Sequence, residues 1–328
     1  MRRRMIGVAA ALLAALAWWL AAMFWMPGAS ARGRSEPLTA HESALADALR
    51  RDVTALGGEI GERNFQQYDA LLAAADYIDH ALTASGYEVR RQRYEVDGRP
   101  FDNLEVERRG TSKPEEIVLV GAHYDSVVGA PGANDNGTGV AAALALAEAF
   151  AGRTTARTVR FVAFVNEEPP FAHTPSMGSV VYATRSRQRG ERITAMLSLE
   201  TMGYFADAPG SQQYPSVLRW VYPDTANFIT FVSNLSSRGE LKRAIKSFRH
   251  VASIPSEGGA LPATISGVGW SDHWSFWQAG FPAIMVTDTA LFRYPAYHTP
   301  NDTPEQVDYE RLARVVAGLE HVVADLAA

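Results

Sequence analysis

Short apolar runs alternate with helical patterns along most of the chain. Four runs have the length and continuity of buried strands: residues 117–122, 159–165, 193–199 and 282–286. Helical periodicity or Ala/Leu-rich composition marks four further segments, at about 38–56, 68–85, 139–150 and 309–326. Continuous apolar strands that alternate with helices are typical of a largely parallel sheet covered on both faces. The pattern predicts an α/β fold of three α/β/α layers with a mostly parallel central sheet.

Two other regions interrupt this alternation. Strand-like runs at 87–94 and 103–107 flank a turn around Gly98, which favours a β-hairpin. Residues 205–265 are rich in Pro, Gly and Ser and contain one helix-like stretch at about 225–232, so we interpret them as a long insertion. A later aromatic cluster is expected in the core and comprises Trp270, Trp274, Phe276 and Trp277.

Residues 1–31 have the pattern of a targeting segment. Three arginines precede residues 5–26, which carry no charge. About 20 apolar residues can span a bilayer as a helix, which favours a hydrophobic N-terminal signal anchor. An Ala-Ser-Ala sequence ends at Ala31, so cleavage of a signal peptide there is the alternative. Both interpretations predict a linker at 32–37 and an exported protein whose remaining residues lie outside the cytoplasm, membrane-anchored if uncleaved and secreted if cleaved.

The amino-acid composition excludes several classes of protein and of metal site. Of the 328 residues, 47% are hydrophobic and 20% are charged, as in ordinary globular proteins, which excludes a disordered or fibrous chain. The net charge of −5 and the lack of a basic cluster beyond the N-terminus argue against a nucleic-acid partner. The chain has no cysteine, so disulfides, iron–sulfur clusters and thiolate metal sites are excluded. Any bound metal must therefore be held by His, Asp and Glu.

Metal-ligand residue types follow each of the four apolar strands. In chain order they are His123 and Asp125, Glu167 and Glu168, Glu200, and Asp288 followed by a loop to His298. Ligands of open parallel sheets bind beyond the carboxyl ends of the strands. We therefore expect these side chains to meet at one edge of the sheet.

Each of these signals is modest by itself. A lone histidine is more often a surface or core residue than a ligand, and adjacent Glu167 and Glu168 would ordinarily be a solvated pair. Directly after a strand, however, neighbouring side chains point to opposite sides, so one can ligate while the other faces a bound water. Asp125, two residues after His123, can orient its imidazole. The sequence has no phosphate-binding loop and no Gly-x-Ser-x-Gly or His-Glu-x-x-His motif.

Longer runs around these residues resemble one known family. The runs are Gly-Ala-His-Tyr-Asp-Ser (121–126), Gly-Ala-Asn-Asp-Asn-Gly-Thr-Gly (132–139), Asn-Glu-Glu (166–168), Leu-Ser-Leu-Glu-Thr-Met-Gly-Tyr (197–204), Ser-Asp-His (271–273) and Tyr-His-Thr-Pro-Asn-Asp-Thr (297–303). In order and spacing they resemble the zinc-dependent exopeptidases, which include bacterial and fungal aminopeptidases, glutamate carboxypeptidase and the related glutaminyl cyclases. The resemblance covers about residues 40–328. It implies the phosphorylase/hydrolase-like fold of that family and a single metallopeptidase catalytic domain at 38–328.

The resemblance also implies a site with two zinc ions per chain. Asp135 would bridge the two ions. His123 and Glu168 would complete one metal site, and Glu200 and His298 would be divided between the remaining positions. The well-known aminopeptidases of the family have Asp where this chain has Glu200, and the extra methylene bears on the spacing and occupancy of that position.

Three further residues would take part in catalysis if the resemblance holds. Glu167 would be the general base that takes the proton of the attacking water and passes it to the leaving amine. Asp125 would hold His123 in the correct tautomer. Tyr297 would donate its phenol to the developing oxyanion.

The leading hypothesis is a metal-dependent aminopeptidase that hydrolyses N-terminal residues from peptide substrates. A single-zinc glutaminyl cyclase is the first alternative, and Glu200 favours it. A carboxypeptidase for acidic C-terminal residues is a second, and it would need a cationic pocket, for which the sequence offers Arg219, Arg238, Arg243 and Arg249. A third is a non-catalytic binding ectodomain on the same fold, as in transferrin receptors. The oligomeric state and the side-chain preference stay open.

Overall fold

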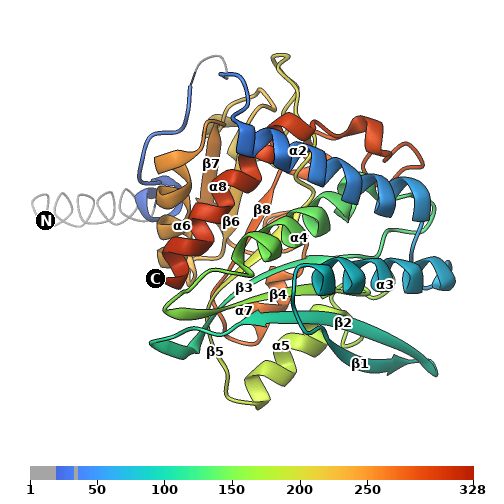
Figure 1. Cartoon of the computed structure of the whole chain (residues 1–328). Helices are drawn as coiled ribbons and strands as arrows, with labels where there is room; N and C mark the ends of the chain where they lie inside the picture. Colours follow the sequence, from blue (N-terminus) through green and yellow to red (C-terminus); the bar gives the residue numbers. More distant parts are fainter. Residues whose placement is uncertain (1–19, 33–35) are drawn as a thin grey trace, which may run out of the picture.

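The computed structural model describes residues 20–32 and 36–328, and its centre is one eight-stranded sheet (Figure 1). The strands are β1 (Arg90–Val96), β2 (Arg99–Arg108), β3 (Lys113–His123), β4 (Arg157–Phe164), β5 (Arg192–Glu200), β6 (Ile229–Ser233), β7 (Ser256–Ala260) and β8 (Ala283–Thr287). Their spatial order is β1-β2-β4-β3-β5-β8-β6-β7. Strands consecutive in sequence are thus neighbours at the two ends of the sheet (β1–β2 and β6–β7) and once in its middle (β3–β4).

The sheet is mixed, and four of its seven strand pairings are parallel, so the predicted mostly parallel sheet is correct for its centre and incomplete toward its edges. The four apolar runs form its parallel centre, in the order β4, β3, β5 and β8. The hairpin β1–β2 joins β4 in antiparallel fashion, and β6 is antiparallel to β8. The predicted centre is correct because strands buried on both faces need continuous apolar sequence. The antiparallel additions lie toward the edges, where polar residues are tolerated.

Helices cover both faces of the sheet and complete a mixed α/β fold (Figure 1). One face carries α2 (Ala40–Val53), α3 (Tyr68–Ala84), α4 (Gly139–Phe150), α6 (Arg238–Val251) and α8 (Tyr309–Ala327). The opposite face carries α5 (Gly178–Gln188) and the short α7 (His273–Gln278). Shorter helical turns are η1 (Thr54–Ile60), η2 (Ala133–Thr138), η3 (Ser216–Trp220), η4 (Ala290–Phe292) and η5 (Pro304–Gln306).

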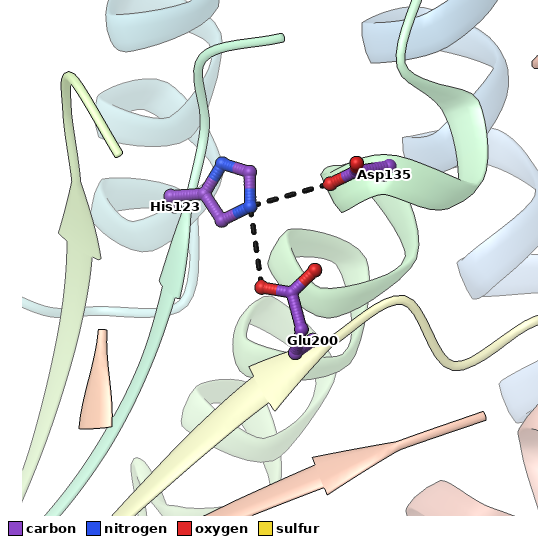
Figure 2. A group of neighbouring side chains, drawn as sticks. All are labelled: His123, Asp135 and Glu200. Atoms are coloured by element: carbon purple, nitrogen blue, oxygen red, sulfur yellow. Dashed lines mark ion pairs between the residues drawn. The ribbon is translucent and has the colours of Figure 1, made fainter. Parts of the chain in front are cut away.

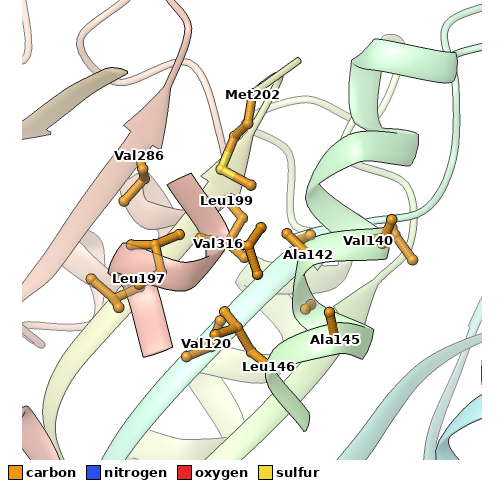
Figure 3. Close-up of a cluster of buried hydrophobic side chains, with 14 of the residues drawn as sticks. Val120, Val140, Ala142, Ala145, Leu146, Leu197, Leu199, Met202, Val286 and Val316 are labelled. Atoms are coloured by element: carbon orange, nitrogen blue, oxygen red, sulfur yellow. The ribbon is translucent and has the colours of Figure 1, made fainter. Parts of the chain in front are cut away.

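The alternation of strand side chains divides the core between these faces. In β3, Val118 and Val120 belong to the cluster under α4 and α8, whereas Ile117 and Leu119 pack on the α5–α7 side. Figure 3 shows Val120 with Leu197 and Leu199 of β5, beside residues of α4 and Val316 of α8. The central strands are therefore held on both faces, which fixes where their carboxyl ends lie.

Residues 205–265 contribute regular structure that the sequence pattern did not predict. They contain β6, α6 and β7, and the stretch expected to be helical includes most of β6. Ile229 and Phe231 face α6, while Thr230 and Val232 face the other side, which is strand alternation over too few residues to be recognised. Gly258 and Gly259 leave β7 without an apolar pattern. The region extends the sheet beyond β8.

The predicted localisation is corrected by the structure. No helix within residues 20–32 and 36–328 is long and apolar enough to cross a membrane. Most of the apolar run at 5–26 lies outside the described residues, as does part of the predicted linker at 32–37. Export, a cleaved signal and membrane anchoring are therefore not retained as properties of this protein.

Replacement of Phe248 tests the packing of α6 against α8. The Phe248 side chain is fully buried, and its ring lies 5.1 Å from that of Phe231. It also lies over Gly318 of α8, where an added Cβ would be 2.4 Å from Phe248 Cε2. We expect Phe248→Ala to lower the free energy of unfolding by about 3–5 kcal/mol in chemical denaturation, because it leaves a cavity. Trp220→Ala is the control, since this side chain is exposed and its loss should change stability by less than about 0.5 kcal/mol. Equal effects of the two substitutions would contradict this account of the packing.

Candidate metal centre

The carboxyl ends of the central strands bring the predicted ligands together. His123 is the last residue of β3 and Glu200 the last residue of β5. Glu168 follows β4, His298 lies in the loop after β8, and Asp135 lies in η2, just before α4. All five side chains predicted as ligands belong to one cluster at this edge of the sheet. Asp288, which also follows a strand, does not join this cluster and accepts hydrogen bonds from Asn134, Tyr204 and Ala290.

The five side chains form two groups that share Asp135. In the first, His123 Nε2 lies 3.3 Å from Asp135 Oδ1 and 3.3 Å from Glu200 Oε2, as Figure 2 shows. In the second, His298 Nε2 lies 3.0 Å from Asp135 Oδ2 and 3.3 Å from Glu168 Oε1. Within each group the ligand atoms lie within 4.8 Å of one another. Asp135 thus offers one carboxylate oxygen to each group.

This grouping differs from the one that the resemblance implied. His123 is grouped with Glu200, not with Glu168, and Glu168 is grouped with His298. The reason is the position of β3 beside β5, with Gly121 paired with Ser198. His123 and Glu200 each lie two residues beyond this pair, so they project from the same face of the sheet.

The residues present fit divalent metal ions. His123 Nε2, Asp135 Oδ1 and Glu168 Oε1 are buried and have no hydrogen-bond partner among the described residues. Buried polar atoms without partners are costly unless a ligand or metal satisfies them. Imidazole nitrogen and carboxylate oxygen are the donors that zinc takes in the absence of cysteine. Each group supplies three protein ligands, the number typical of a catalytic zinc site that keeps a further position for water or substrate.

Burial and mutual repulsion disturb the titration of the acids. Burial, followed by the neighbouring Asp135 carboxylate, raises the pKa of Glu168 to about 7. Burial also raises the pKa values of Glu167 and Glu200. Burial opposes the charged form of His298, but the neighbouring Asp135 and Glu168 carboxylates outweigh this effect and raise its pKa to about 10. The protein alone thus compensates the negative charge of this cluster incompletely, as expected of a cation-binding site.

Asp125 positions the ligands differently from the prediction. His123 Nδ1 lies 3.1 Å from the backbone carbonyl oxygen of Asp125, while the nearest Asp125 carboxylate oxygen is 3.6 Å away. A hydrogen on Nδ1 donated to this carbonyl leaves the Nε2 lone pair directed at the cluster. The Asp125 carboxylate instead accepts the backbone N–H groups of Glu167 and Glu168, both at 3.1 Å. Asp125 therefore fixes both the imidazole and the chain that carries the two glutamates.

The loop that carries Asp135 is held by residues to which the sequence assigned no role. Asp302 accepts hydrogen bonds from the backbone N–H groups of Asn134 and Asp135, at 2.8 and 3.0 Å. Asn136 donates to the Leu199 carbonyl at 2.7 Å and accepts from the Thr201 N–H, on either side of Glu200. Both residues stand in the runs that carry the family resemblance, which is the signal that could have identified them.

Arg63 is a second residue that the sequence did not indicate. Its side chain is fully buried and donates to the carbonyl oxygens of Tyr124, Pro131 and Gly132 at 2.6, 2.6 and 2.8 Å. Two further donations reach the carbonyls of residues 56 and 61. The guanidinium thus joins the loop after β3 to η1 and to the loop before Asp135. Its partners are main-chain atoms, so no side-chain pattern could reveal it.

The remaining predicted residues lie beside the ligands. Glu167 Oε2 is 3.9 Å from His123 Nε2, and Glu167 belongs to neither ligand group. The Tyr297 ring stacks on His298 with centroids 3.9 Å apart, and burial raises the pKa of its phenol, which stays protonated near neutral pH. Ser271 Oγ donates to Glu200 Oε2 at 2.7 Å and so holds this carboxylate, as expected for a residue that supports a ligand.

The fold and the site together define an α/β metallohydrolase whose ligands stand at the carboxyl edge of a mixed sheet. Residues 103–323 match Peptidase family M28, and the chain belongs to this family. The prediction of a zinc-dependent metallopeptidase of the exopeptidase type is confirmed at this level.

Comparison with individual proteins agrees with the family. The chain is 34% identical over 285 residues to the uncharacterized protein YfbL of Escherichia coli, covering 84% of this chain and 87% of that protein. Among solved structures, the zinc aminopeptidase BSAP from Bacillus subtilis is similar with a TM-score of 0.66, at 16% identity, over 86% of this chain and 94% of its own. A glutaminyl cyclase from Fimbriiglobus ruber is similar with a TM-score of 0.63, at 20% identity, over 91% and 99%. At these identities the two structures show a common fold.

Replacement of Asp302 tests the support of the Asp135 loop. Each carboxylate oxygen of Asp302 accepts one backbone N–H group. Asp302→Asn replaces one of these oxygens by an amide NH2 donor, so one of the two N–H groups loses its acceptor. We expect the free energy of unfolding to fall by about 1–3 kcal/mol and zinc affinity to fall with it. Tyr294→Phe is the matched control, because it removes only the 2.8 Å hydrogen bond that Tyr294 donates to Asp302. Stability is measured by thermal unfolding and zinc affinity by titration. Equal losses of stability and zinc affinity in D302N and Y294F would contradict the assigned role of Asp302.

Proposed function

We propose that the protein is an aminopeptidase that binds two zinc ions and hydrolyses the N-terminal peptide bond of its substrates. The observation that carries the proposal is the pair of ligand groups that share Asp135, beside a carboxylate, Glu167, that belongs to neither group. The first zinc would be held by His123, Asp135 and Glu200. The second would be held by Asp135, Glu168 and His298.

Two zinc ions, when bound, polarise a scissile carbonyl and lower the pKa of water. The proton chemistry falls to Glu167. Its carboxylate accepts the proton of the water whose oxygen attacks the carbonyl carbon, and it donates this proton to the amine nitrogen as the carbon–nitrogen bond breaks. Burial raises the pKa of Glu167, which brings the carboxyl group closer to the pH at which it can both accept and donate a proton.

Two neighbours prepare this step. Asp125 accepts the backbone N–H groups of Glu167 and Glu168 and so fixes the backbone that carries both glutamates. Asp125 is therefore a positioning residue. Tyr297 keeps its proton and stands against His298, from where the phenol can donate to the oxygen that becomes negative in the transition state.

The alternatives differ in what they require of the site. A cyclase of the single-zinc kind needs one ligand group, whereas this chain completes two. A carboxypeptidase for acidic residues needs a cationic pocket, and none of Arg219, Arg238, Arg243 and Arg249 lines the pocket that adjoins Glu200. A binding ectodomain requires no general base, yet Glu167 is retained beside the ligands.

Replacement of Glu167 by glutamine tests the general base. We expect Glu167→Gln to lower kcat roughly 10²–10⁴-fold in steady-state hydrolysis of aminoacyl anilides, with KM little changed. Zinc content measured by mass spectrometry should stay at the wild-type level, because Glu167 is in neither ligand group. Glu168→Gln is the matched comparison and should lose zinc together with activity. A fully active E167Q enzyme would exclude the proposed base, and unchanged physiological function of an inactive E167Q chain would favour a binding protein.

Metal stoichiometry separates the aminopeptidase from the cyclase. We expect two zinc ions per chain in protein purified without chelator, and hydrolysis that requires a free α-amine on the substrate. Removal of the ions with a chelator should abolish hydrolysis, and zinc should restore it. One ion per chain, with cyclisation of N-terminal glutamine and no hydrolysis, would instead identify the cyclase.

A further inference from the structure

A pocket adjoins the metal centre and extends along the sheet toward β7. It begins at Glu200 and Tyr297, and we call it the side pocket. Most of its wall is aromatic or aliphatic: Tyr214, Leu218, Tyr222, Phe228, Val268 and Met285. Trp270 and Leu291 also line it and are 50% and 42% exposed, so they stand where the pocket meets solvent. Trp270 is therefore not a core residue as its sequence context had suggested.

Four polar side chains cross this apolar pocket in one row. Strand pairing places Glu200 beside Thr287, Thr287 beside Thr230, and Thr230 beside Glu257. All four line the side pocket. Because neighbouring strands are about 4.8 Å apart, the α-carbons of Glu200 and Glu257 are separated by about 14 Å. The row thus leads from a metal ligand to a second carboxylate at the far end.

Glu257 makes no close ion pair in the described part of the chain. No described ion pair or hydrogen bond involves its carboxylate, and burial raises its pKa although the charges of Arg249 and Arg32 act in the opposite direction. The half-buried Arg249 uses its guanidinium on Ser256 and on the backbone carbonyls of residues 26–28. Thr230 Oγ1 beside Glu257 is likewise buried without a hydrogen-bond partner. Two oxygen acceptors at the same end of the pocket are therefore available to a ligand.

The distance matches one class of amino-acid side chain. A lysine side chain reaches about 6 Å from its α-carbon to its nitrogen, and arginine slightly further, from standard bond lengths. A residue whose α-carbon lies a few ångströms from the metal centre would place such a cation within hydrogen-bond distance of Glu257. Its methylene stem would lie against the apolar wall, while shorter apolar side chains would leave the far end and both acceptors unfilled.

We propose that the side pocket selects substrates whose N-terminal residue is a long side chain with a cationic tip, lysine or arginine, and that Glu257 is the specificity residue. This inference rests on the proposed aminopeptidase function. Thr230 supplies a second acceptor for the same cation. Glu257 takes no part in the chemical step.

The test compares substrates that differ in the charged tip alone. The zinc-loaded protein is assayed with lysyl, norleucyl and alanyl 4-nitroanilides, because norleucine has the four-carbon stem of lysine without its amine. We expect kcat/KM for the lysyl substrate to exceed that for the norleucyl substrate about tenfold or more, the usual effect of a charged hydrogen bond. In Glu257→Gln the ratio should fall to about one, while norleucyl and alanyl hydrolysis stay near wild type, which also shows that the variant folds.

Glu115→Gln is the matched control, since Glu115 is an exposed carboxylate at the amino end of β3, opposite the metal centre. It should keep the wild-type ratio. Hydrolysis of norleucyl substrate as fast as lysyl in the wild type, or a ratio unaffected by E257Q, overturns the inference and leaves the aminopeptidase function standing. Hydrolysis of none of the three substrates overturns both.

Discussion

The concentration of buried negative charge at the carboxyl edge of the sheet is the constraint to which the rest of the structure responds. Asp135, Glu167 and Glu200 lie within 4 Å of His123 Nε2, and Glu168 lies beside His298. Asp135, Glu168 and Glu200 are buried, and Glu167 is partly so. Like charges in a buried site raise one another's pKa values or require a compensating cation. Two imidazoles provide part of that compensation. The remaining deficit is the physical reason that divalent cations belong to this site.

Because repulsion would spread such a cluster, the fold holds it through main-chain hydrogen bonds. Asp125 and Asp302 each accept two backbone N–H groups, and Asn136 spans the end of β5. Arg63 instead acts as a donor, because its guanidinium donates to backbone carbonyls of three segments: residues 56–61, Tyr124 and residues 131–132. The ligand loops are thus irregular in conformation, yet side chains satisfy several of their buried backbone groups, as buried backbone requires. Ligand geometry is thus set in part by residues that hold the backbone of the ligand loops, in addition to those that contact ligand side chains directly, as Ser271 contacts Glu200.

The difference between apolar strands, which have a sequence pattern, and main-chain hydrogen bonds, which have none, explains what the sequence could predict. Strands β3, β4, β5 and β8 were predictable because burial on both faces demands uninterrupted apolar residues, and their carboxyl ends then indicated the ligands. The grouping of His123 with Glu200 was not, because it depends on the lateral order and register of strands that are distant in sequence. Arg63 was missed because carbonyl partners leave no side-chain signature. Strands β6 and β7 were missed because each has only five residues and contains Thr, Ser or Gly, so neither shows a recognisable alternation of apolar and polar residues.

The two missed strands matter for the chemistry, because they extend the sheet past β8 and form the base of the side pocket. The position of Glu257 relative to Glu200 is fixed by three consecutive strand pairings and does not depend on loop conformation. This distance is well defined, because backbone hydrogen bonds keep neighbouring strands of a sheet at a nearly constant spacing. The distance between the Glu200 and Glu257 carboxylates therefore depends on the number of strands between them, and it sets the side-chain length that the pocket can accommodate. Adding or removing one strand would change that length by about 5 Å, close to the reach of a whole side chain, which makes the β6–β7 extension a structural determinant of substrate choice.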